Sequence, residues 1–202
     1  SLEDIHKILR SGADKVAINT AAIKKPSIIF EASKKFGKST IVSSIEIKKN
    51  NNEYYCYFDN GRNFSKIKAV NWIKKILKLG AGELLITFID TEGTGKGIDL
   101  NFLKEISKFV NIPVVANGGI GKKSHVKELF EETDISGIAI SSMFHYSYLN
   151  KQKKKLKDMK NFEEGNLDYL NNYYNSNNNI QFSEIKSLKK YLIKNKVNVR
   201  YI

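Results

Sequence analysis

The sequence predicts an α/β protein in which parallel strands alternate with helices, and three observations lead to that class. First, an apolar run suited to a buried strand, residues 84–89, ends in Asp-Thr-Glu-Gly-Thr, and an amphipathic helix begins at Asp99. Second, the same order of apolar run, polar turn and helix recurs along the chain, which is typical of buried parallel sheets. Third, the helix and strand around Ile5 recur about 121 residues later, around Val126.

Periodicity and turn residues place the individual elements. The expected helices cover residues 2–11, a segment from Pro26 to Gly37, about 69–79, a segment from Asp99 to Val110, a segment around 126–130, and about 183–195. The expected strands cover 15–20, 40–49, 83–90, 113–119 and 138–143. Asp59-Asn60-Gly61 is expected to join residues 53–58 and 64–67 in a hairpin.

Five strand–helix units cannot close a (β/α)₈ barrel, so we expect an incomplete barrel that covers about strands 4–8. The first residues, Ser-Leu-Glu-Asp, form a helix N-cap pattern, and the three remaining units are therefore expected upstream of Ser1. We expect residues 1–202 to form one such domain. An insertion at about 146–180, rich in Lys, Asn and Tyr, is expected to lie outside the barrel, as a disordered loop or as a lid.

Composition narrows the function classes. The net charge is +13, but the lysines are scattered and arginine is scarce, so we expect no nucleic acid partner and favour a small anionic substrate. No apolar run approaches the roughly 20 residues that span a bilayer, and no signal sequence is visible, so we expect a cytoplasmic protein without a membrane partner. The three histidines lack metal-ligand spacing, and we expect neither a metal nor another cofactor.

The carboxyl ends of barrel strands carry the active site, and two places there suit phosphate groups. Gly118-Gly119 and Ser141-Ser142 follow the last two strands and offer amides and hydroxyls to an anion. The internal repeat assigns a second phosphate site to Asn19 and Thr20. Turn formation alone also explains each pair, but together they favour a substrate with a phosphate at each end.

Two glutamates lie between the predicted phosphate sites. Glu46 interrupts an apolar strand, and a carboxylate there must be partnered or used, for example in acid–base catalysis. Glu92 follows the strand that contains Thr87, whose side chain is expected to point into the barrel mouth. The alternative for Glu46 is an outward-facing side chain paired with Lys48.

Two opposite charges begin strands at the other end of the barrel. Lys15 and Glu83 follow matching Gly-Ala-Asp and Gly-Ala-Gly steps. They are expected either to form an ion pair or to be solvated strand ends.

Several motifs in order resemble one family, the cyclase subunit of imidazole glycerol phosphate synthase, HisF. They are Gly-Ala-Asp-Lys-Val-Ala-Ile-Asn-Thr-Ala-Ala (12–22), Gly-Ala-Gly-Glu-Leu-Leu (80–85), Ile-Asp-Thr-Glu-Gly-Thr-Gly-Lys-Gly-Ile-Asp (89–99), Ala-Asn-Gly-Gly (116–119) and Val-Asn-Val-Arg (197–200). The likeness covers nearly all of the chain outside residues 146–180 and corresponds to about the last two-thirds of that subunit.

The resemblance implies a lyase of histidine biosynthesis. Such a barrel takes ammonia from a glutaminase partner, HisH, at its floor. It converts a bisphosphorylated aminoimidazole carboxamide ribonucleotide into imidazole glycerol phosphate and aminoimidazole carboxamide ribotide. The resemblance assigns catalysis to Glu46, with assistance from Glu92. It assigns phosphate contacts to Asn19, Thr20, Gly93, Gly118, Gly119, Ser141 and Ser142, and half of a charged ammonia gate to Lys15 and Glu83.

The sequence departs from the family at the catalytic positions, because Glu46 and Glu92 stand where the family has aspartates. Ser43-Ser44 and the long segment after the last strand are more similar to HisF-like subunits of amidotransferases that modify surface sugars. In that alternative the barrel conducts ammonia without cyclisation. A third hypothesis is a barrel that binds phosphates without chemistry. The 202-residue chain alone is expected to be inactive.

Overall fold

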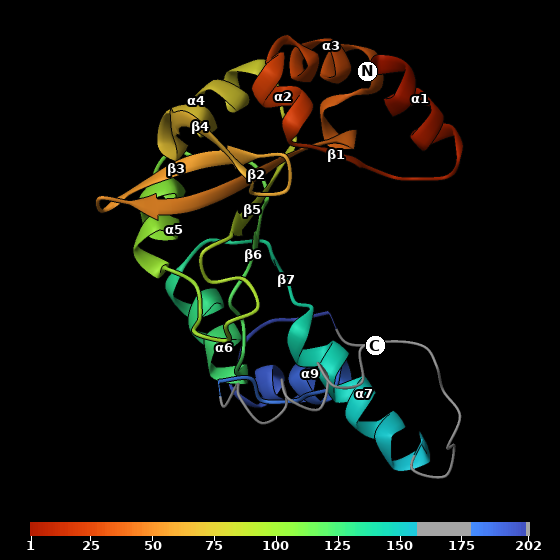
Figure 1. Ribbon diagram of the computed structural model, residues 1–202, viewed down its shortest axis with the longest axis vertical. Coiled ribbons are helices and arrows are strands. Elements are labelled where there is room, and N and C mark those ends of the chain that lie inside the picture. The colour runs from red at the N-terminus through yellow and green to blue at the C-terminus, as the bar shows by residue number, and fades with distance from the viewer. Residues whose placement is uncertain (157–178, 201–202) are drawn as a thin grey trace. The chain divides into compact units, whose positions relative to one another are not determined.

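The computed structural model describes residues 1–156 and 179–200 (Figure 1). These residues fall into two compact units, which we describe separately. The first contains residues 1–90, 99–118 and 133–139, and the second contains residues 91–98, 119–132 and the described residues from 140 onward. Within the described residues, no helix is both long and apolar enough to cross a membrane.

A parallel sheet of five strands forms the frame of the first unit, in the order β1-β2-β5-β6-β7. The strands are β1 (Val16–Ile18), β2 (Ile41–Asn50), β5 (Glu83–Phe88), β6 (Val114–Asn117) and β7 (Gly137–Ala139). No pairing joins β7 to β1 in the part of the chain described, so this sheet is open. Parallel strands connected through helices are the arrangement that the sequence predicts, and the fold class is confirmed.

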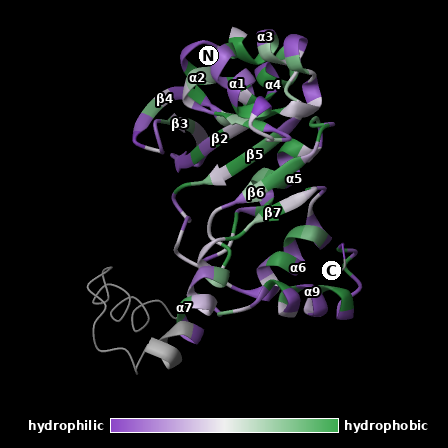
Figure 2. Ribbon diagram, turned by 90° about the vertical axis from the view of Figure 1, so that its right-hand side faces the viewer, coloured by the Kyte–Doolittle hydropathy of each residue, from purple (hydrophilic) through white to green (hydrophobic). Residues whose placement is uncertain are grey.

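The two faces of the sheet differ in burial. Ile45 and Ile47 on β2, and Ile86 and Phe88 on β5, point to one face and are at most 2 % exposed. Side chains of the covering helices, such as Trp72, are equally buried. Residues at alternate positions point to the opposite face. Figure 2 shows the hydrophobic character of β5 and β6 in green.

The helices of the first unit begin and end where their sequences provide caps. They are α1 (Leu2–Arg10), α2 (Thr20–Lys24), α3 (Ser27–Phe36), the 3-10 turn η1 (Lys38–Thr40), α4 (Ala69–Leu79) and α5 (Leu100–Ser107). In α1, Ser1 and Asp4 form a capping box, because each accepts a hydrogen bond from the backbone or terminal nitrogen of the other. Gly80 ends α4 in a left-handed conformation, which glycine adopts without strain.

The face of α1 is less buried than its periodicity predicts. Leu2, Ile5, Ile8 and Leu9 share one helical face in the sequence, but only Ile5 is buried and Ile8 is 45 % exposed. Periodicity identifies the apolar face of a helix but does not establish what covers it.

A hairpin extends from the carboxyl end of β2. Strands β3 (Glu53–Phe58) and β4 (Asn63–Lys68) pair antiparallel, and β3 also pairs antiparallel with residues 46–50 of β2. Asp59 and Asn60 have positive φ values of 58° and 56°, as a tight hairpin turn requires. Cys56 in β3 is fully buried, and this burial raises the pKa of its thiol to about 12.

The described residues of the second unit form three helices: α6 (Lys123–Glu132), α7 (Ser142–Leu156) and α9 (Ile185–Lys194). The segment after residue 178 packs against two glycines. A Cβ at Gly95 would lie 2.7 Å from Ile180, and one at Gly121 would lie 2.4 Å from the Asn179 carbonyl oxygen. The Gln181 N–H donates to the Gly121 carbonyl at 2.7 Å, so both glycines are required by close approach of this segment.

The end of the last strand differs from the prediction. The apolar pattern predicts a strand over 138–143, whereas β7 ends at Ala139 and α7 begins at Ser142. The amides of Phe144 and His145 donate to the Ser141 carbonyl at 3.1 and 2.9 Å, which commits these residues to a helix. Helix α7 also includes the first part of the predicted insertion. Residues 157–178 of that insertion lie outside the described residues.

Candidate functional site

A row of polar side chains crosses the carboxyl ends of three neighbouring strands in the first unit. Glu46 of β2 is in register with Thr87 of β5, and Thr87 is in register with Asn117 of β6. Residues in register on parallel strands point to the same face, which here is opposite to Ile45, Ile47 and Phe88. The Asn117 Nδ2 donates to the Thr87 Oγ1 at 3.2 Å. The predicted residues Glu46 and Thr87 are therefore brought together.

The carboxylate of Glu46 is bound by the hairpin turn. The Gly61 N–H donates to the Glu46 Oε2 at 2.7 Å, and the side chain is half-buried. Among the described residues, Glu46 forms no ion pair, so the alternative arrangement with Lys48 is not observed. One carboxylate oxygen is fixed by a backbone amide, and this leaves the second oxygen for another partner.

The same turn reaches the end of β1. The Asp59 N–H donates to the Thr20 Oγ1 at 2.9 Å, two residues before the amide that binds Glu46. The hairpin turn thus connects two predicted site residues that are 26 positions apart in the sequence.

Asn19 lies beside Thr20 and has an unusual environment. It is the N-cap residue of α2, yet its side chain makes no capping hydrogen bond. Both polar atoms of its amide are buried, and neither has a hydrogen-bond partner within the described part of the chain. A buried polar group without a partner costs about 1–3 kcal/mol, so such a group is an expected place for a bound ligand or water.

Glycines 118 and 119 make close approaches to the protein itself. A Cβ at Gly118 would lie 2.5 Å from the Phe88 carbonyl oxygen, and one at Gly119 would lie 2.3 Å from the Gly97 carbonyl oxygen. Both residues have positive φ, at 98° and 88°. Packing therefore requires glycine at both positions, in addition to any role in binding an anion.

The other residues predicted to bind phosphate or to assist catalysis, Glu92, Gly93, Ser141 and Ser142, belong to the second unit. Glu92 is exposed and Gly93 is half-buried in the segment 91–98. The Gly97 N–H donates to the Gly119 carbonyl at 2.7 Å, which joins this segment to Gly119. Ser141 and Ser142 lie at the start of α7.

The predicted charges at the amino ends of the strands form an ion pair. The Lys15 Nζ contacts the Glu83 Oε2. The side chain of Glu83 is 17 % exposed and that of Lys15 is 47 % exposed, so the pair is partly accessible to water. The ion-pair alternative is thus the one observed.

Lys49 donates hydrogen bonds to Asp90 and Asp99, the two residues that flank the segment 91–98. Its backbone N–H donates to the Asp90 Oδ2 at 3.3 Å, and its Nζ donates to the Asp99 Oδ2 at 3.1 Å. The Tyr54 hydroxyl also donates to the Asp99 Oδ2 at 3.1 Å. Asp99 in turn accepts hydrogen bonds from the amides of Asn101 and Phe102 and so caps α5.

This network alters two ionisation equilibria. Burial raises the pKa of the Asp99 carboxyl, but hydrogen bonds from Lys49, Tyr54 and the Phe102 amide outweigh burial, and the pKa is lowered overall. Burial and the charge of Asp99 raise the pKa of the Tyr54 phenol, which keeps that hydroxyl a donor.

Sequence reasoning missed four contributors: Asn117, the amides of Asp59 and Gly61, and Lys49. Asn117 was recognisable in principle. It is a polar residue at the end of an apolar strand, and strand alternation places it on the same face as Val115. The two turn amides are backbone groups, and no residue type reveals which side chain they bind. Within the described residues, no group of three or more His, Cys, Asp and Glu side chains could hold a metal ion.

The fold and the polar row define a class: an α/β protein of the (β/α)₈-barrel type with polar side chains at the carboxyl ends of its parallel strands. The sequence profile described as "Histidine biosynthesis protein" matches residues 1–150. The chain belongs to this family.

Three relatives are similar to the chain and have the same name, imidazole glycerol phosphate synthase subunit HisF. The protein from Bacillus cereus (strain G9842) is 42% identical over 161 residues, which are 78% of this chain and 64% of the relative. The protein from Hydrogenobaculum sp. (strain Y04AAS1) is 44% identical over 151 residues, 74% of this chain and 60% of the relative. The protein from Clostridium botulinum (strain Kyoto / Type A2) is 40% identical over 164 residues, 80% of this chain and 63% of the relative. The chain thus spans less than two thirds of the length of these relatives.

Proposed function

We propose that this chain provides the carboxyl-terminal part of a cytoplasmic cyclase of the HisF type. In this proposal the whole protein takes ammonia and a bisphosphorylated aminoimidazole carboxamide ribonucleotide and releases imidazole glycerol phosphate and aminoimidazole carboxamide ribotide. The observation that carries the proposal is the polar row of Glu46, Thr87 and Asn117 on one face of the strand ends. The names of the relatives, imidazole glycerol phosphate synthase subunit HisF, support imidazole glycerol phosphate as a product. The other reactants are those that the resemblance implies.

Glu46 is proposed as a general acid–base residue. The Gly61 amide holds one of its oxygens at 2.7 Å, so the carboxylate has a fixed direction while its other oxygen can exchange a proton with substrate. Thr87 and Asn117 form a hydrogen-bonded pair beside it and offer a hydroxyl and an amide to the substrate ring. Glu92 is proposed to assist from the segment 91–98.

Asn19 and Thr20 are proposed to bind one phosphate group. The unpartnered, buried Nδ2 of Asn19 is a donor that an anion would satisfy. The N-terminus of a helix adds further donors beside it, since Thr20 is the first residue of α2. The second phosphate is proposed to bind Gly93, Gly118, Gly119, Ser141 and Ser142.

A glutaminase of the HisH type is the proposed partner at the opposite end of the strands. Ammonia must enter where no substrate binds, and the Lys15–Glu83 pair lies at the amino ends of β1 and β5. An ion pair that opens and closes there would serve as part of an ammonia gate. The relatives named above give no support to the alternative role in sugar modification.

The test gives the whole protein the bisphosphorylated ribonucleotide with ammonium salt as the nitrogen source and measures formation of both products. We expect turnover by the unmodified protein and a loss of about 10²–10⁴-fold in kcat in Glu46→Gln. Glutamine keeps the oxygen that accepts from Gly61 but transfers no proton. The 202-residue chain alone is expected to give no turnover.

The matched control is Glu3→Gln, which removes the same charge from an exposed position on α1. Its kcat should equal that of the unmodified protein. Absence of turnover by the whole protein at high ammonium concentration would contradict the proposed reaction. Full activity in Glu46→Gln would instead contradict the acid–base role of Glu46.

A further inference from the structure

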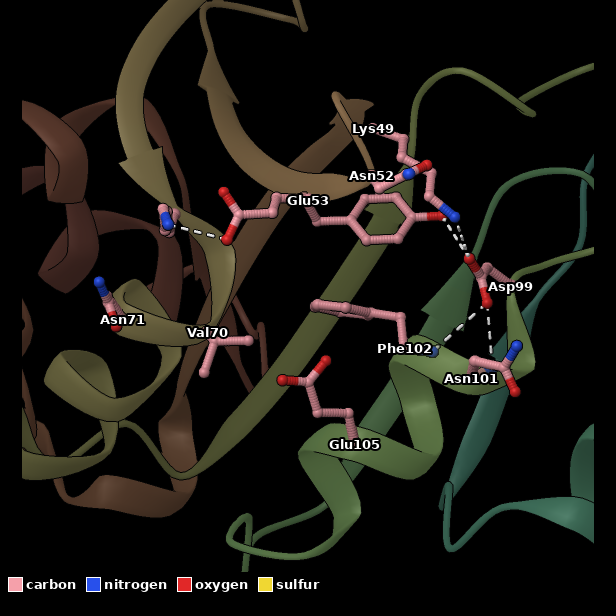
Figure 3. A pocket seen from close by; sticks show the side chains of 11 residues that line it. Lys49, Asn52, Glu53, Val70, Asn71, Asp99, Asn101, Phe102 and Glu105 are labelled. Carbon is pink, nitrogen blue, oxygen red and sulfur yellow. Dashed lines mark hydrogen bonds and ion pairs between the residues drawn. The ribbon is translucent and has the colours of Figure 1, made fainter.

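A cavity lies on the other side of the sheet from the polar row. It has a volume of about 380 Å³ and lies between the start of the hairpin, the first turn of α4 and the helix α5 (Figure 3). Cavities that bind small molecules begin at about 300 Å³. Phe88, which packs against the aromatic wall of this cavity, alternates with Thr87 and points away from the row of Glu46 and Thr87.

One wall of the cavity is aromatic and rigid. The rings of Tyr54 and Phe102 lie 4.7 Å apart between centroids, and each also packs edge-on against Phe88, at 5.5 and 5.9 Å. The Tyr54 hydroxyl is fixed by its hydrogen bond to Asp99. Val70 of α4 adds an aliphatic surface opposite Phe102.

The lysines of the cavity are already paired. Lys49 contacts Asp99 at 3.1 Å, and Lys68 contacts Glu53 at 2.8 Å. No unpaired cation therefore lines the cavity in the described part of the chain, and an anionic ligand would find no free positive charge there.

One acidic side chain of the cavity is unpaired. Among the described residues, no hydrogen bond or ion pair is made by the carboxylate of Glu105, which extends from α5 toward Val70 and Asn71 on α4 (Figure 3). The lining thus has two lysines and three carboxylates, a net charge of −1, on a chain whose total charge is +13. This local excess of negative charge selects for a cation.

We propose that this cavity is a binding site for a small organic monocation with an apolar or planar body, such as a protonated primary amine. The cation would pair with Glu105 and lie beside the Phe102 ring, which attracts positive charge. The Tyr54 ring already has the Lys49 Nζ over it, 5.6 Å from its centroid. The body of the ligand would contact Val70 and Phe102. The side-chain amides of Asn71 and Asn101 are exposed at the edge of the cavity and would hydrogen-bond further polar groups.

The probe for this site is benzylammonium, with benzyl alcohol and benzoate as neutral and anionic analogues of the same shape. Titration into ¹⁵N-labelled protein should shift the resonances of Asn71, Asn101 and Phe102 and should saturate with a Kd of about 1–10 mM, as a ligand of this size allows. The two analogues should produce no saturable shift. Added salt should weaken binding of the cation.

Glu105→Gln tests the charge at the site without changing its shape. It should weaken benzylammonium binding by about fivefold, which is the upper range for an exposed ion pair. Glu128→Gln, on an exposed position of α6, is the matched control and should leave the affinity unchanged. The inference is overturned if benzoate binds as well as benzylammonium, if Glu105→Gln binds the cation as tightly as the unmodified protein, or if shifts do not saturate.

Discussion

Ser43 places a hydroxyl group inside the buried sheet. Its side chain is fully buried on β2, and its hydroxyl has no hydrogen-bond partner in the part of the chain described. Such a hydroxyl has lost its water without gaining a replacement, which costs free energy. A smaller apolar side chain avoids that cost.

We therefore predict that Ser43→Ala raises the free energy of unfolding by about 1 kcal/mol. The measurement is urea-induced unfolding followed by circular dichroism. Ser44→Ala, at the half-buried neighbouring position on the opposite face, is the control and should change stability less. A decrease in stability in Ser43→Ala would mean that the hydroxyl contributes a favourable interaction.

At the scale of single residues, the sequence could identify side chains but not the backbone groups that bind them. Glu46 was recognisable because a carboxylate inside an apolar strand is costly, and Lys15 and Glu83 because opposite charges begin two strands after matching Gly-Ala steps. The Gly61 amide was not recognisable as the partner of Glu46, since every residue except proline has such an amide. The assigned roles of these residues stay predictions.

The carboxylate that caps helix α5 also accepts hydrogen bonds from two strands, β2 and β3. Asp99 caps α5, binds Lys49 at the end of β2 and accepts from Tyr54 of β3. Its pKa is lowered in the folded protein. A lowered pKa means that the ionised form contributes stability above the ordinary value of about 3.9 and that this contribution is lost as the pH falls through the lower folded value.

Asp99→Asn should therefore reduce stability most at neutral pH. Asparagine keeps a capping oxygen but removes the charge. The difference in free energy of unfolding between the two proteins should be constant from pH 7 to about 5 and should shrink below about pH 4. Urea unfolding at several pH values measures it. The exposed Asp134→Asn is the control, and a difference that does not depend on pH would contradict the prediction.

The ends of helices were predicted well where a capping residue in the local sequence marks them. The end of a strand was predicted poorly where pairing with a neighbouring strand determines it. Gly37 and Asp99 mark helix limits in the sequence, and the structure places helix limits beside both. The last strand was predicted to end at residue 143, four residues beyond the end of β7 at Ala139. β7 pairs only with β6 over residues 137–139, and the following apolar residues are equally suited to a helix.

At the scale of the whole chain, positive charge is in excess. Lys and Arg number 34 against 21 Asp and Glu, and the described ion pairs lie mostly at exposed positions, where each contributes little. Repulsion among like charges therefore opposes folding. The fold class was nevertheless predictable, because hydrophobic periodicity and motif order do not depend on net charge.

We predict that added salt raises the melting temperature. Between about 10 mM and 150 mM NaCl the Debye length falls from about 30 Å to about 8 Å, which screens the repulsion among surface lysines. Differential scanning calorimetry measures the shift, and NaF in place of NaCl controls for specific binding of chloride. A melting temperature that falls with both salts would mean that attractive pairs dominate the surface.

The two bonds of Lys49 have a consequence for how this protein can vary. Asp90 accepts a hydrogen bond from the backbone N–H of Lys49 and Asp99 accepts one from its Nζ, so the eight residues between them begin and end beside the same residue of β2. A strand of such a sheet and the helix after it thus keep their places when the intervening segment is lengthened, shortened or exchanged.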